Sequence, residues 1–309
     1  MTNAPLIRLG TRRSPLAMAQ AHETRARLCA AHGLDESAVE LVPVVAGGDK
    51  VQDRPLADVG GKALWTRELD AWLAEGKIDA AVHSLKDVET IRPEEIALVA
   101  ILPRADRRDV LLGAGSIAAI PQGARLGTSA PRRASQMKNL RPDIEVVLFR
   151  GNVATRMAKL QAGEADVTLL AAAGLERLGE AGVGSALEVE TWLPAPSQGA
   201  IGIECRTEDA RTRDLLTAID HPRTRAEVLA ERTLLEALGG SCQSPIGLLA
   251  LQQDEQIRLN AALFSADGAE RVDGAVEVAP GDADAIAAFA ADLLARATPG
   301  IAVLFSGAS

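Results

Sequence analysis

Short apolar runs alternate with helix-like stretches through the first two thirds of the chain. The runs lie at residues 7–9, 39–45, 79–83, 96–102, 110–112, 144–149 and 166–171. Runs of this length, separated by helical stretches of about 10 to 15 residues, are typical of βαβ units. The pattern therefore predicts an α/β fold with parallel or mixed sheets.

Two later patterns predict individual elements. Leu69, Trp72 and Leu73 follow the i, i+3, i+4 spacing of an amphipathic helix, which we expect over 66–75 with its apolar face in the core. Farther along, strands at 256–264 and 270–278 flank a turn at 266–268, and a helix follows over 282–296. This order of strand, strand and helix differs from the preceding pattern, so it predicts a separate small α+β domain.

Two segments interrupt the α/β pattern. Pro103 with the charged residues 104–109, and the proline-containing residues 194–199, have the composition of crossings between two lobes. Two lobes joined by two strands enclose a cleft, and clefts between domains are favoured ligand sites. We expect domain 1 to comprise 1–102 and 200–219, domain 2 to comprise 103–199, and the α+β domain to comprise 220–309.

Charge and composition argue against several classes of protein. The net charge of −9 disfavours a nucleic-acid-binding or membrane-surface protein, because both normally carry a basic excess. Residues 1–10 contain no long apolar segment, and the longest apolar run, 96–102, is too short to span a bilayer. We therefore expect a cytoplasmic protein. The three cysteines form no C-x-x-C pair, which predicts neither a disulfide framework nor a zinc site.

Arginine is unusually frequent, with 27 arginines against 6 lysines. Codon bias and a need for bidentate grip on carboxylate or phosphate explain this excess equally well. The positions of the arginines distinguish the two explanations. One arrangement occurs three times, at 9–15, 126–133 and 149–156: a strand, then Gly with a small polar residue, then an arginine near a helix start. Helix N-termini and the carboxyl ends of strands both attract anions. The three segments favour a ligand with several acidic groups.

Phosphate can be tested as the anion against known fingerprints. Segment 59–63 lacks the leading Gly and the final Ser or Thr of a P-loop, and segment 113–118 runs into Pro121 instead of opening a helix. Neither segment predicts a nucleotide site, so carboxylates are the better candidates.

Lys86 and Asp87 directly follow the apolar run 80–82. A carboxylate beside an ammonium stays ionised, and it can stabilise a developing cation or accept a proton. On this segment alone, a solvated Lys-Asp turn is the more ordinary explanation. We expect the nearby His83 to be structural.

Cys242 lies in the loop 239–247, whose glycines permit close approach of the backbone. A thiol in such a loop can act as a nucleophile, although most such thiols are inert. We expect Cys29, in a helix, and Cys205, at the end of a strand, to be buried.

Eight segments together resemble the porphobilinogen deaminase family, also called hydroxymethylbilane synthases, over nearly the whole chain. They are GTRRSPLA from Gly10, VGGKALWTREL from Val59, AVHSLKD from Ala81, GTSAPRR from Gly127, RGNVATR from Arg150, AAAGLERLG from Ala171, PSQGAIGIE from Pro196 and GGSCQSPIG from Gly239. Their number and order make a chance resemblance very improbable.

The resemblance implies a cytoplasmic, monomeric transferase with two periplasmic-binding-protein-like α/β lobes and a small C-terminal α+β domain. Enzymes of this family carry a dipyrromethane cofactor, which the resemblance places on Cys242 through a thioether. They condense four porphobilinogen molecules head to tail, release ammonia from each, and free linear hydroxymethylbilane for tetrapyrrole and heme biosynthesis. Porphobilinogen bears an acetate and a propionate, so the resemblance implies that the arginine segments bind these carboxylates. No metal, nucleic acid or membrane is implied.

The resemblance also assigns roles to individual residues. Asp87 is the implied catalytic carboxylate, which stabilises positive charge on the pyrrole as ammonia leaves. The implied cofactor- and substrate-binding residues are Arg12, Ser14, Lys86, Thr128, Ser129, Arg132, Arg133, Arg150, Arg156, Arg177 and Gln198.

Four positions depart from residues that are common in the family. Ala130 replaces a Ser, Trp65 a Phe and Ser241 a Gly, and Ala46-Gly47-Gly48-Asp49 stands where the family commonly has a Thr or Arg before Gly-Asp. None of these changes removes the tether, the carboxylate or the paired arginines. They affect the expected rate and the covering of the cleft.

A second hypothesis is a two-lobed binding protein that holds a small carboxylate without chemistry, because a fold alone does not fix function. Such a protein needs neither Asp87 nor Cys242.

Overall fold

The computed structural model describes residues 4–44 and 66–305 of the chain. Contacts group these residues into two compact units: unit 1 contains 4–44, 66–105 and 199–225, and unit 2 contains 106–198 and 226–305. The expected division into three domains stays a prediction, as does the cleft between the lobes. Trp65, Ala46 and the segment 59–63 lie outside the described residues.

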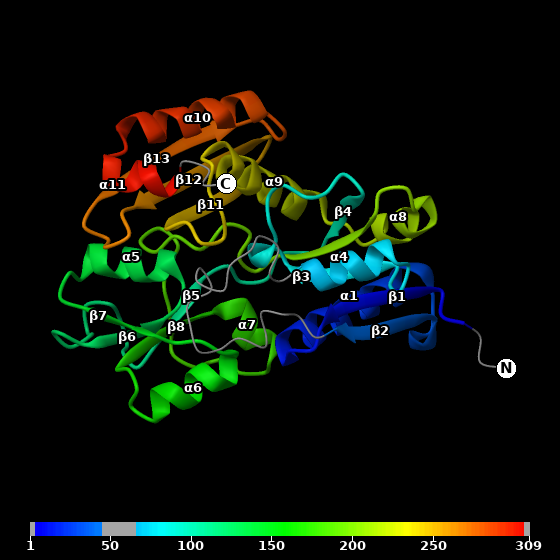
Figure 1. The fold of residues 1–309 in the computed structure, drawn as a ribbon, viewed down its shortest axis with the longest axis horizontal. Helices are drawn as coiled ribbons and strands as arrows, with labels where there is room; N and C mark the ends of the chain where they lie inside the picture. Colours follow the sequence, from blue (N-terminus) through cyan, green and yellow to red (C-terminus); the bar gives the residue numbers. More distant parts are fainter. Residues whose placement is uncertain (1–3, 45–65, 306–309) are drawn as a thin grey trace. The chain divides into compact units, whose positions relative to one another are not determined.

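Unit 1 is built on a five-stranded mixed sheet with the order β2-β1-β3-β10-β4 (Figure 1). β1 runs parallel to β2 and β3, whereas β10 is antiparallel to β3 and β4. Fully buried Leu9, Ala80 and Ile203 belong to one apolar cluster in this sheet. The strands are β1 (Ile7–Arg12), β2 (Val39–Val44), β3 (Ala80–Ser84), β4 (Ile96–Ile101) and β10 (Ile201–Arg206).

The first helix of unit 1 begins and ends at residues suited to helix caps. Ser14 accepts a hydrogen bond from the Ala17 amide at the start of the first helix, and Gly33 ends it in the left-handed conformation (φ 62°). Leu69 and Leu73 of the second α-helix are buried, as the sequence pattern predicts. The elements are α1 (Pro15–His32), η1 (Glu36–Ala38), α4 (Arg67–Ala74), η2 (Leu85–Asp87) and α8 (Ala210–Thr217).

The first sheet of unit 2 repeats this plan, with the order β7-β6-β8-β5-β9. β6 runs parallel to β7 and β8, and β5 is antiparallel to β8 and β9. Buried Leu126, Val167 and Trp192 pack together in its core. The elements are β5 (Asp109–Leu112), β6 (Arg125–Thr128), α5 (Pro131–Leu140), β7 (Glu145–Leu148), α6 (Val153–Gln161), β8 (Val167–Ala171), α7 (Ala172–Arg177) and β9 (Ser185–Ala186).

Unit 2 also contains an antiparallel sheet with the order β11-β12-β13 (Figure 1). Its apolar cluster includes Leu248, Leu259, Phe289 and Leu293. The elements are α9 (Pro222–Ala237), whose residues from 226 belong to unit 2, β11 (Ile246–Gln253), β12 (Gln256–Phe264), β13 (Arg271–Val278), α10 (Ala283–Arg296), α11 (Pro299–Ala302) and η3 (Val303–Phe305).

The turn between β12 and β13 docks on α5. Ser135 Oγ donates a hydrogen bond to the Ala266 carbonyl (3.1 Å), and Asn139 Nδ2 donates one to the Gly268 carbonyl (2.9 Å). The turn predicted at 266–268 is therefore confirmed, and it also joins the C-terminal sheet to the helix that carries the arginine pair.

The predicted fold class is confirmed: two α/β sheets with helices, and a small C-terminal sheet with its helix. Apart from β1 and β10, the ends of the predicted strands and helices lie within one residue of the observed ends; β10, expected over 200–204, continues to Arg206. β1 is longer than predicted and continues through Arg12. β9 and β11 were not predicted. None of the helices in the described ranges has the length and hydrophobicity needed to cross a bilayer.

Candidate functional site

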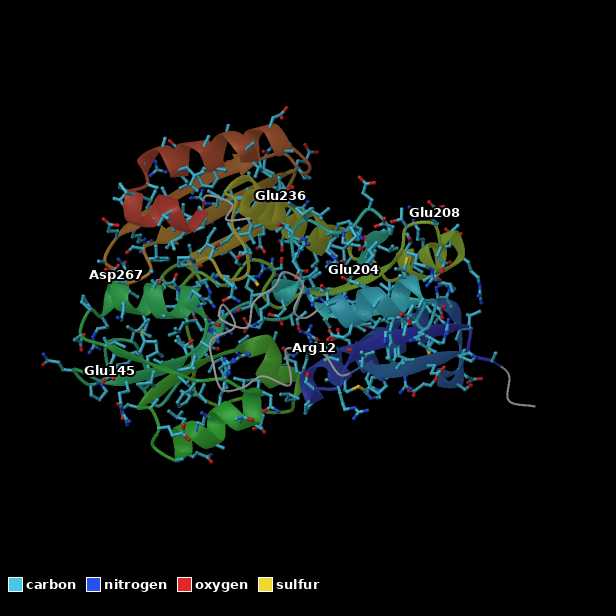
Figure 2. The ribbon with its side chains drawn as sticks, in the orientation of Figure 1. Arg12, Glu145, Glu204, Glu208, Glu236 and Asp267 are labelled. Atoms are coloured by element: carbon cyan, nitrogen blue, oxygen red, sulfur yellow. The ribbon has the colours of Figure 1, made fainter. Side chains whose placement is uncertain are left out.

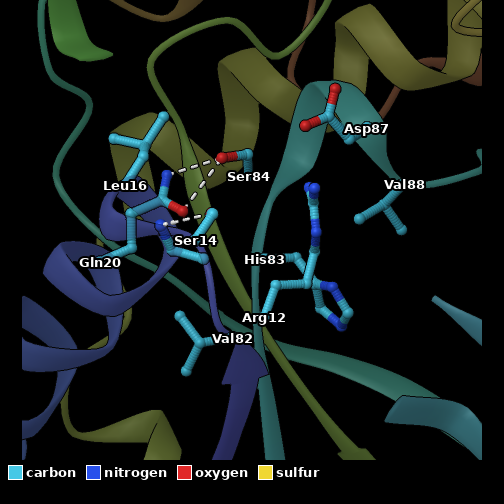
Figure 3. A pocket seen from close by; sticks show the side chains of 10 residues that line it. Arg12, Ser14, Leu16, Gln20, Val82, His83, Ser84, Asp87 and Val88 are labelled. Atoms are coloured by element: carbon cyan, nitrogen blue, oxygen red, sulfur yellow. Dashed lines mark hydrogen bonds between the residues drawn. The ribbon is translucent and has the colours of Figure 1, made fainter. Parts of the chain in front are cut away.

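A pocket in unit 1 lies where the carboxyl ends of β1 and β3 meet (Figure 3). Arg12 ends β1, Ser14 caps α1, and Asp87 ends the short η2 turn after β3. β1 and β3 are parallel neighbours, so their carboxyl ends share one edge of the sheet. Figure 3 shows the Arg12 side chain extending toward Asp87. The structure therefore brings together three residues that the sequence predicts for the site.

The turn that carries Lys86 and Asp87 is seated by a buried leucine. Leu85 is 1% exposed, and its amide donates a hydrogen bond to the Ala200 carbonyl. Gly202 in β10 lies beneath it: a Cβ at Gly202 would be 2.3 Å from Leu85 Cδ2. The absence of a side chain at Gly202 thus sets the height of the turn above the sheet.

Two further polar residues line the pocket beside the predicted ones. Gln20 Nε2 lies 2.7 Å from Ser84 Oγ, and Ser84 Oγ lies 3.0 Å from Gln20 Oε1 (Figure 3). Sequence reasoning missed both residues. Gln20 lies inside a helix that showed no motif of its own, and only its contact with Ser84 across 64 positions reveals it.

A buried charged cluster lies beneath the pocket. Glu204 of β10, labelled in Figure 2, is fully buried, and Arg92 donates to both of its oxygens at 2.9 Å. His83 Nε2 lies 3.3 Å from Glu204 Oε2, without the alignment of a hydrogen bond. Burial alone would raise the pKa of Glu204, but the His83 ring and Arg92 lower it to about 2. His83 thus lies against the buried Glu204 as well as lining the pocket.

The arginine segments of unit 2 follow the carboxyl ends of β6 and β7. Thr128 ends β6, and its Oγ1 accepts a hydrogen bond from the Ala130 amide (3.1 Å). Asn152 caps α6 through the Thr155 amide (2.9 Å). Arg156 donates to Gly151 O (3.0 Å) and lies 3.4 Å from Ser129 Oγ. These contacts bring Ser129 and Arg156 together.

Arg150 and Arg177 occupy comparable positions after other strands. Arg150 is buried, two residues before the Asn152 cap. Arg177 is half-buried at the end of α7, which follows β8. The predicted arginines of unit 2 therefore follow the carboxyl ends of three parallel neighbours, β6, β7 and β8.

Arg132 and Arg133, in the first turn of α5, converge on Asp109. Arg132 Nη2 donates to Asp109 Oδ2 and Arg133 Nη2 to Asp109 Oδ1, each at 2.7 Å. Gln198 Nε2 donates to Oδ1 (2.9 Å) and Trp192 Nε1 to Oδ2 (2.8 Å). Asp109 is fully buried. Burial would raise its pKa, but the two guanidinium groups hold it well below its usual range.

Asp109 was not predicted as a site residue. It falls in the charged segment 104–109, which the sequence presented only as a crossing. Its partners are 23 to 89 positions away, so no local spacing signals them.

Cys242 is exposed in the loop between α9 and β11, and Gln243 Nε2 lies 3.8 Å from its sulfur. Cys205 is buried as expected, and burial raises its pKa to about 11. Cys29, expected to be buried, is half-buried, because one edge of α1 faces solvent. The accessible thiol therefore belongs to the residue that the sequence selected.

Comparison with known proteins gives two family matches. Residues 7–214 match the model of the family described as "Porphobilinogen deaminase, dipyromethane cofactor binding domain", and residues 225–295 match that of "Porphobilinogen deaminase, C-terminal domain".

Two curated relatives carry the same name. The chain is 59% identical over 306 residues to the porphobilinogen deaminase of Sphingopyxis alaskensis, covering 97% of this chain and 96% of that one. It is 49% identical over 267 residues to the porphobilinogen deaminase of Paracoccus denitrificans, covering 85% of each.

Solved structures show weaker likeness. A mutant VFT2 domain of BvgS from Bordetella pertussis matches with a TM-score of 0.41 and 16% identity over 69% of this chain and 84% of that one. An arginine-specific periplasmic binding protein of Salmonella typhimurium matches with a TM-score of 0.40 and 11% identity over 74% and 98%.

Proposed function

Because this chain belongs to the porphobilinogen deaminase family, we propose which of its residues carry the reaction of that family. The enzyme joins four porphobilinogen molecules head to tail on a dipyrromethane cofactor, releases ammonia from each, and yields linear hydroxymethylbilane for tetrapyrrole biosynthesis. The family matches favour this function over a non-catalytic carboxylate-binding protein. The observation that carries the residue assignment is the single exposed cysteine, Cys242, among the three of the chain.

The residues present fit a dipyrromethane with carboxylate side chains. Cys242 offers an accessible sulfur for a thioether. In the same unit, Arg132 and Arg133 share a single carboxylate, Asp109, so their pair carries one surplus positive charge for an acidic ligand. When bound, the dipyrromethane supplies the free pyrrole carbon to which the first porphobilinogen is joined. Thr128, Ser129, Arg150, Arg156, Arg177 and Gln198 complete the proposed binding set of unit 2.

Asp87 is the proposed catalytic residue. In each condensation the bond between the aminomethyl carbon and its nitrogen breaks, ammonia leaves, and the remaining methylene pyrrole carries positive charge. A carboxylate beside that ring stabilises the charge without being consumed. The new carbon–carbon bond then forms at the free pyrrole carbon of the chain, which loses its proton. Lys86, Arg12 and Ser14 hold substrate carboxylates beside Asp87.

One experiment with two variants tests these roles. The intact mass of the purified protein should exceed the sequence mass by two linked pyrrole units, and Cys242→Ser should lack this increment. Asp87→Asn should stay folded and still bind porphobilinogen, while turnover falls by about 10²- to 10⁴-fold.

Opposite results reject the roles separately. Active protein with an unmodified mass rejects the tether, a full increment in Cys242→Ser moves the attachment to another residue, and unchanged turnover in Asp87→Asn rejects the catalytic role.

Three features of the whole protein complete the proposal. The enzyme is a monomer. It works in the cytoplasm on a small-molecule substrate, without nucleic acid or membrane. It folds as three domains, which comprise 1–102 with 200–219, 103–199, and 220–309. The family and the net charge of −9 support these features. Light scattering of the purified protein measures the first, and a dimer mass would contradict it.

A further inference from the structure

Asp109 is the most heavily hydrogen-bonded side chain near the predicted cofactor-binding arginines, and the proposed reaction gives it no role. Its two oxygens each accept two hydrogen bonds. Oδ1 accepts from Arg133 and Gln198, and Oδ2 accepts from Arg132 and Trp192, all at 2.7 to 2.9 Å. The donors come from three separate places in the chain: the first turn of α5, Trp192 and the crossing at Gln198.

The charges in this cluster do not balance. Two guanidinium groups, each 6% exposed at the side chain, face one carboxylate that is fully buried. Arg132 Nη1 donates a hydrogen bond to the Leu193 carbonyl (2.9 Å), and Arg133 Nη1 donates one to the Leu169 carbonyl (2.8 Å). Among the described residues the Nε atoms of both arginines are buried without a hydrogen-bond partner.

A purely structural ion pair does not need a second guanidinium group or buried donors without partners. Buried donors are normally hydrogen-bonded, and a buried charge without a counter-charge is costly. One aspartate and one arginine would already be neutral. The second guanidinium group and the two remaining Nε donors match what a carboxylate ligand needs, namely positive charge and hydrogen-bond donors in a fixed orientation.

The same cluster is connected to the cysteine loop through Leu193. The Leu193 carbonyl accepts hydrogen bonds from Arg132 Nη1 and from Gln136 Nε2 (3.2 Å). Gly247, five positions after Cys242, lies against Leu193, since a Cβ at Gly247 would be 2.7 Å from Leu193 Cβ. The start of β11, which ends the cysteine loop, and the arginine pair therefore share one anchoring residue.

We propose that Asp109 is a positioning residue that fixes the orientation of Arg132 and Arg133 while leaving their surplus charge for a carboxylate of the pyrrole chain. The inference rests on the proposed function, in which these two arginines bind carboxylates. Asp109 itself does not touch the ligand. Trp192 and Gln198 saturate the remaining positions on its oxygens, so the carboxylate cannot rotate away from the arginines.

Asp109→Asn tests the proposal, because the amide keeps the size of the side chain but removes its charge and one acceptor. The KM for porphobilinogen should rise roughly ten- to hundredfold, the loss expected when hydrogen bonds of charged groups are misaligned. The fraction of protein that carries the two-pyrrole mass should fall as well. Asp109→Glu restores the charge and should recover part of both losses.

Asp79→Asn is the matched control. Asp79 accepts hydrogen bonds from Arg8 Nε (3.1 Å) and Nη2 (2.8 Å), and it precedes the amino end of β3, away from Asp87. Its loss should lower the melting temperature while the KM and the mass increment stay at their wild-type values.

Several outcomes overturn the proposal. Folded Asp109→Asn with wild-type KM and full mass increment does so, and so does Asp79→Asn with the same rise in KM. If Asp109→Asn does not fold, Trp192→Phe is the second variant, because it removes a single uncharged donor to Oδ2 of Asp109. A KM raised severalfold in this variant supports the proposal, and an unchanged KM contradicts it. Wild-type protein without turnover or mass increment would instead reject the proposed function.

Discussion

Leu85 and Gly202 show how one pair of residues positions Asp87, the proposed catalytic carboxylate. Gly202 leaves the space that Leu85 fills, and Leu85 directly precedes Lys86 and Asp87 in the same short turn. The position of Asp87 therefore depends on an apolar contact with the sheet. A motif comparison alone would assign Gly202 no such role.

We expect Gly202→Ala to lower turnover. The new methyl group would lie 2.3 Å from Leu85 Cδ2, so Leu85 must shift and carry Asp87 with it. Misplacement by about 1 Å costs on the order of a hundredfold in rate, and overpacking costs roughly 1–3 kcal/mol in stability. Steady-state kinetics and thermal unfolding measure both effects.

Gly115→Ala is the control, since no atom lies within 4 Å of a Cβ at that position. Turnover of Gly202→Ala equal to that of Gly115→Ala would show that the turn does not depend on this contact.

At the scale of single elements, apolar runs and caps were enough to predict most of the strands, the N-terminal start of α1 and the turn at 266–268. They failed at β11, because the run 246–251 directly follows the cysteine loop without a separating turn signal. They also failed at Asp109 and Gln20, whose partners come from distant strands and helices. Local pattern places a side chain on an element, but only tertiary packing shows which partner it meets.

The element β10 contributes a pH-dependent stability through Glu204. Its pKa of about 2 lies below the ordinary value of 4.5, so the ionised carboxylate stabilises the fold above pH 4.5. This stabilisation is lost as the pH falls from 4.5 toward 2, because the unfolded chain binds the proton first. The shift corresponds to about 3 kcal/mol.

Glu204→Gln should therefore be less stable than wild type at neutral pH and should lose less stability on acidification. Urea unfolding at a series of pH values measures the difference. Glu277→Gln removes an exposed partner of Arg258 and serves as the control. A pH dependence of Glu204→Gln parallel to that of wild type would contradict the assignment.

At the scale of the whole molecule, one topology is used twice. Each five-stranded sheet has three parallel neighbours, and the proposed ligand-binding residues follow their carboxyl ends in both sheets. In unit 1 this edge carries Arg12 and Asp87, and in unit 2 it carries Thr128, Arg150 and Arg177. The sequence predicted the edge in each case, because three of its arginine segments follow strands.

Glu231 of α9 has a consequence for the motions of unit 2. Its buried carboxylate accepts hydrogen bonds from the Ser197 amide (2.7 Å) and the Ala250 amide (2.9 Å). Ser197 has a positive φ of 61°, an uncommon conformation for a residue with a side chain, and it directly precedes Gln198. Each amide bonds to a different oxygen of this one carboxylate, so a movement of the Glu231 side chain loosens both segments.

The protons of these two amides should accordingly exchange with solvent deuterium as one cooperative event. Glu231→Ala should accelerate both, whereas the Gln252 amide, which bonds to Glu227 (3.0 Å), should keep its own rate. Residue-resolved exchange rates by NMR decide this, and independent rates for Ser197 and Ala250 would contradict it. Through Glu231, the loop beside Gln198 and the strand beyond the cysteine loop would then open and close together, as one cooperative unit.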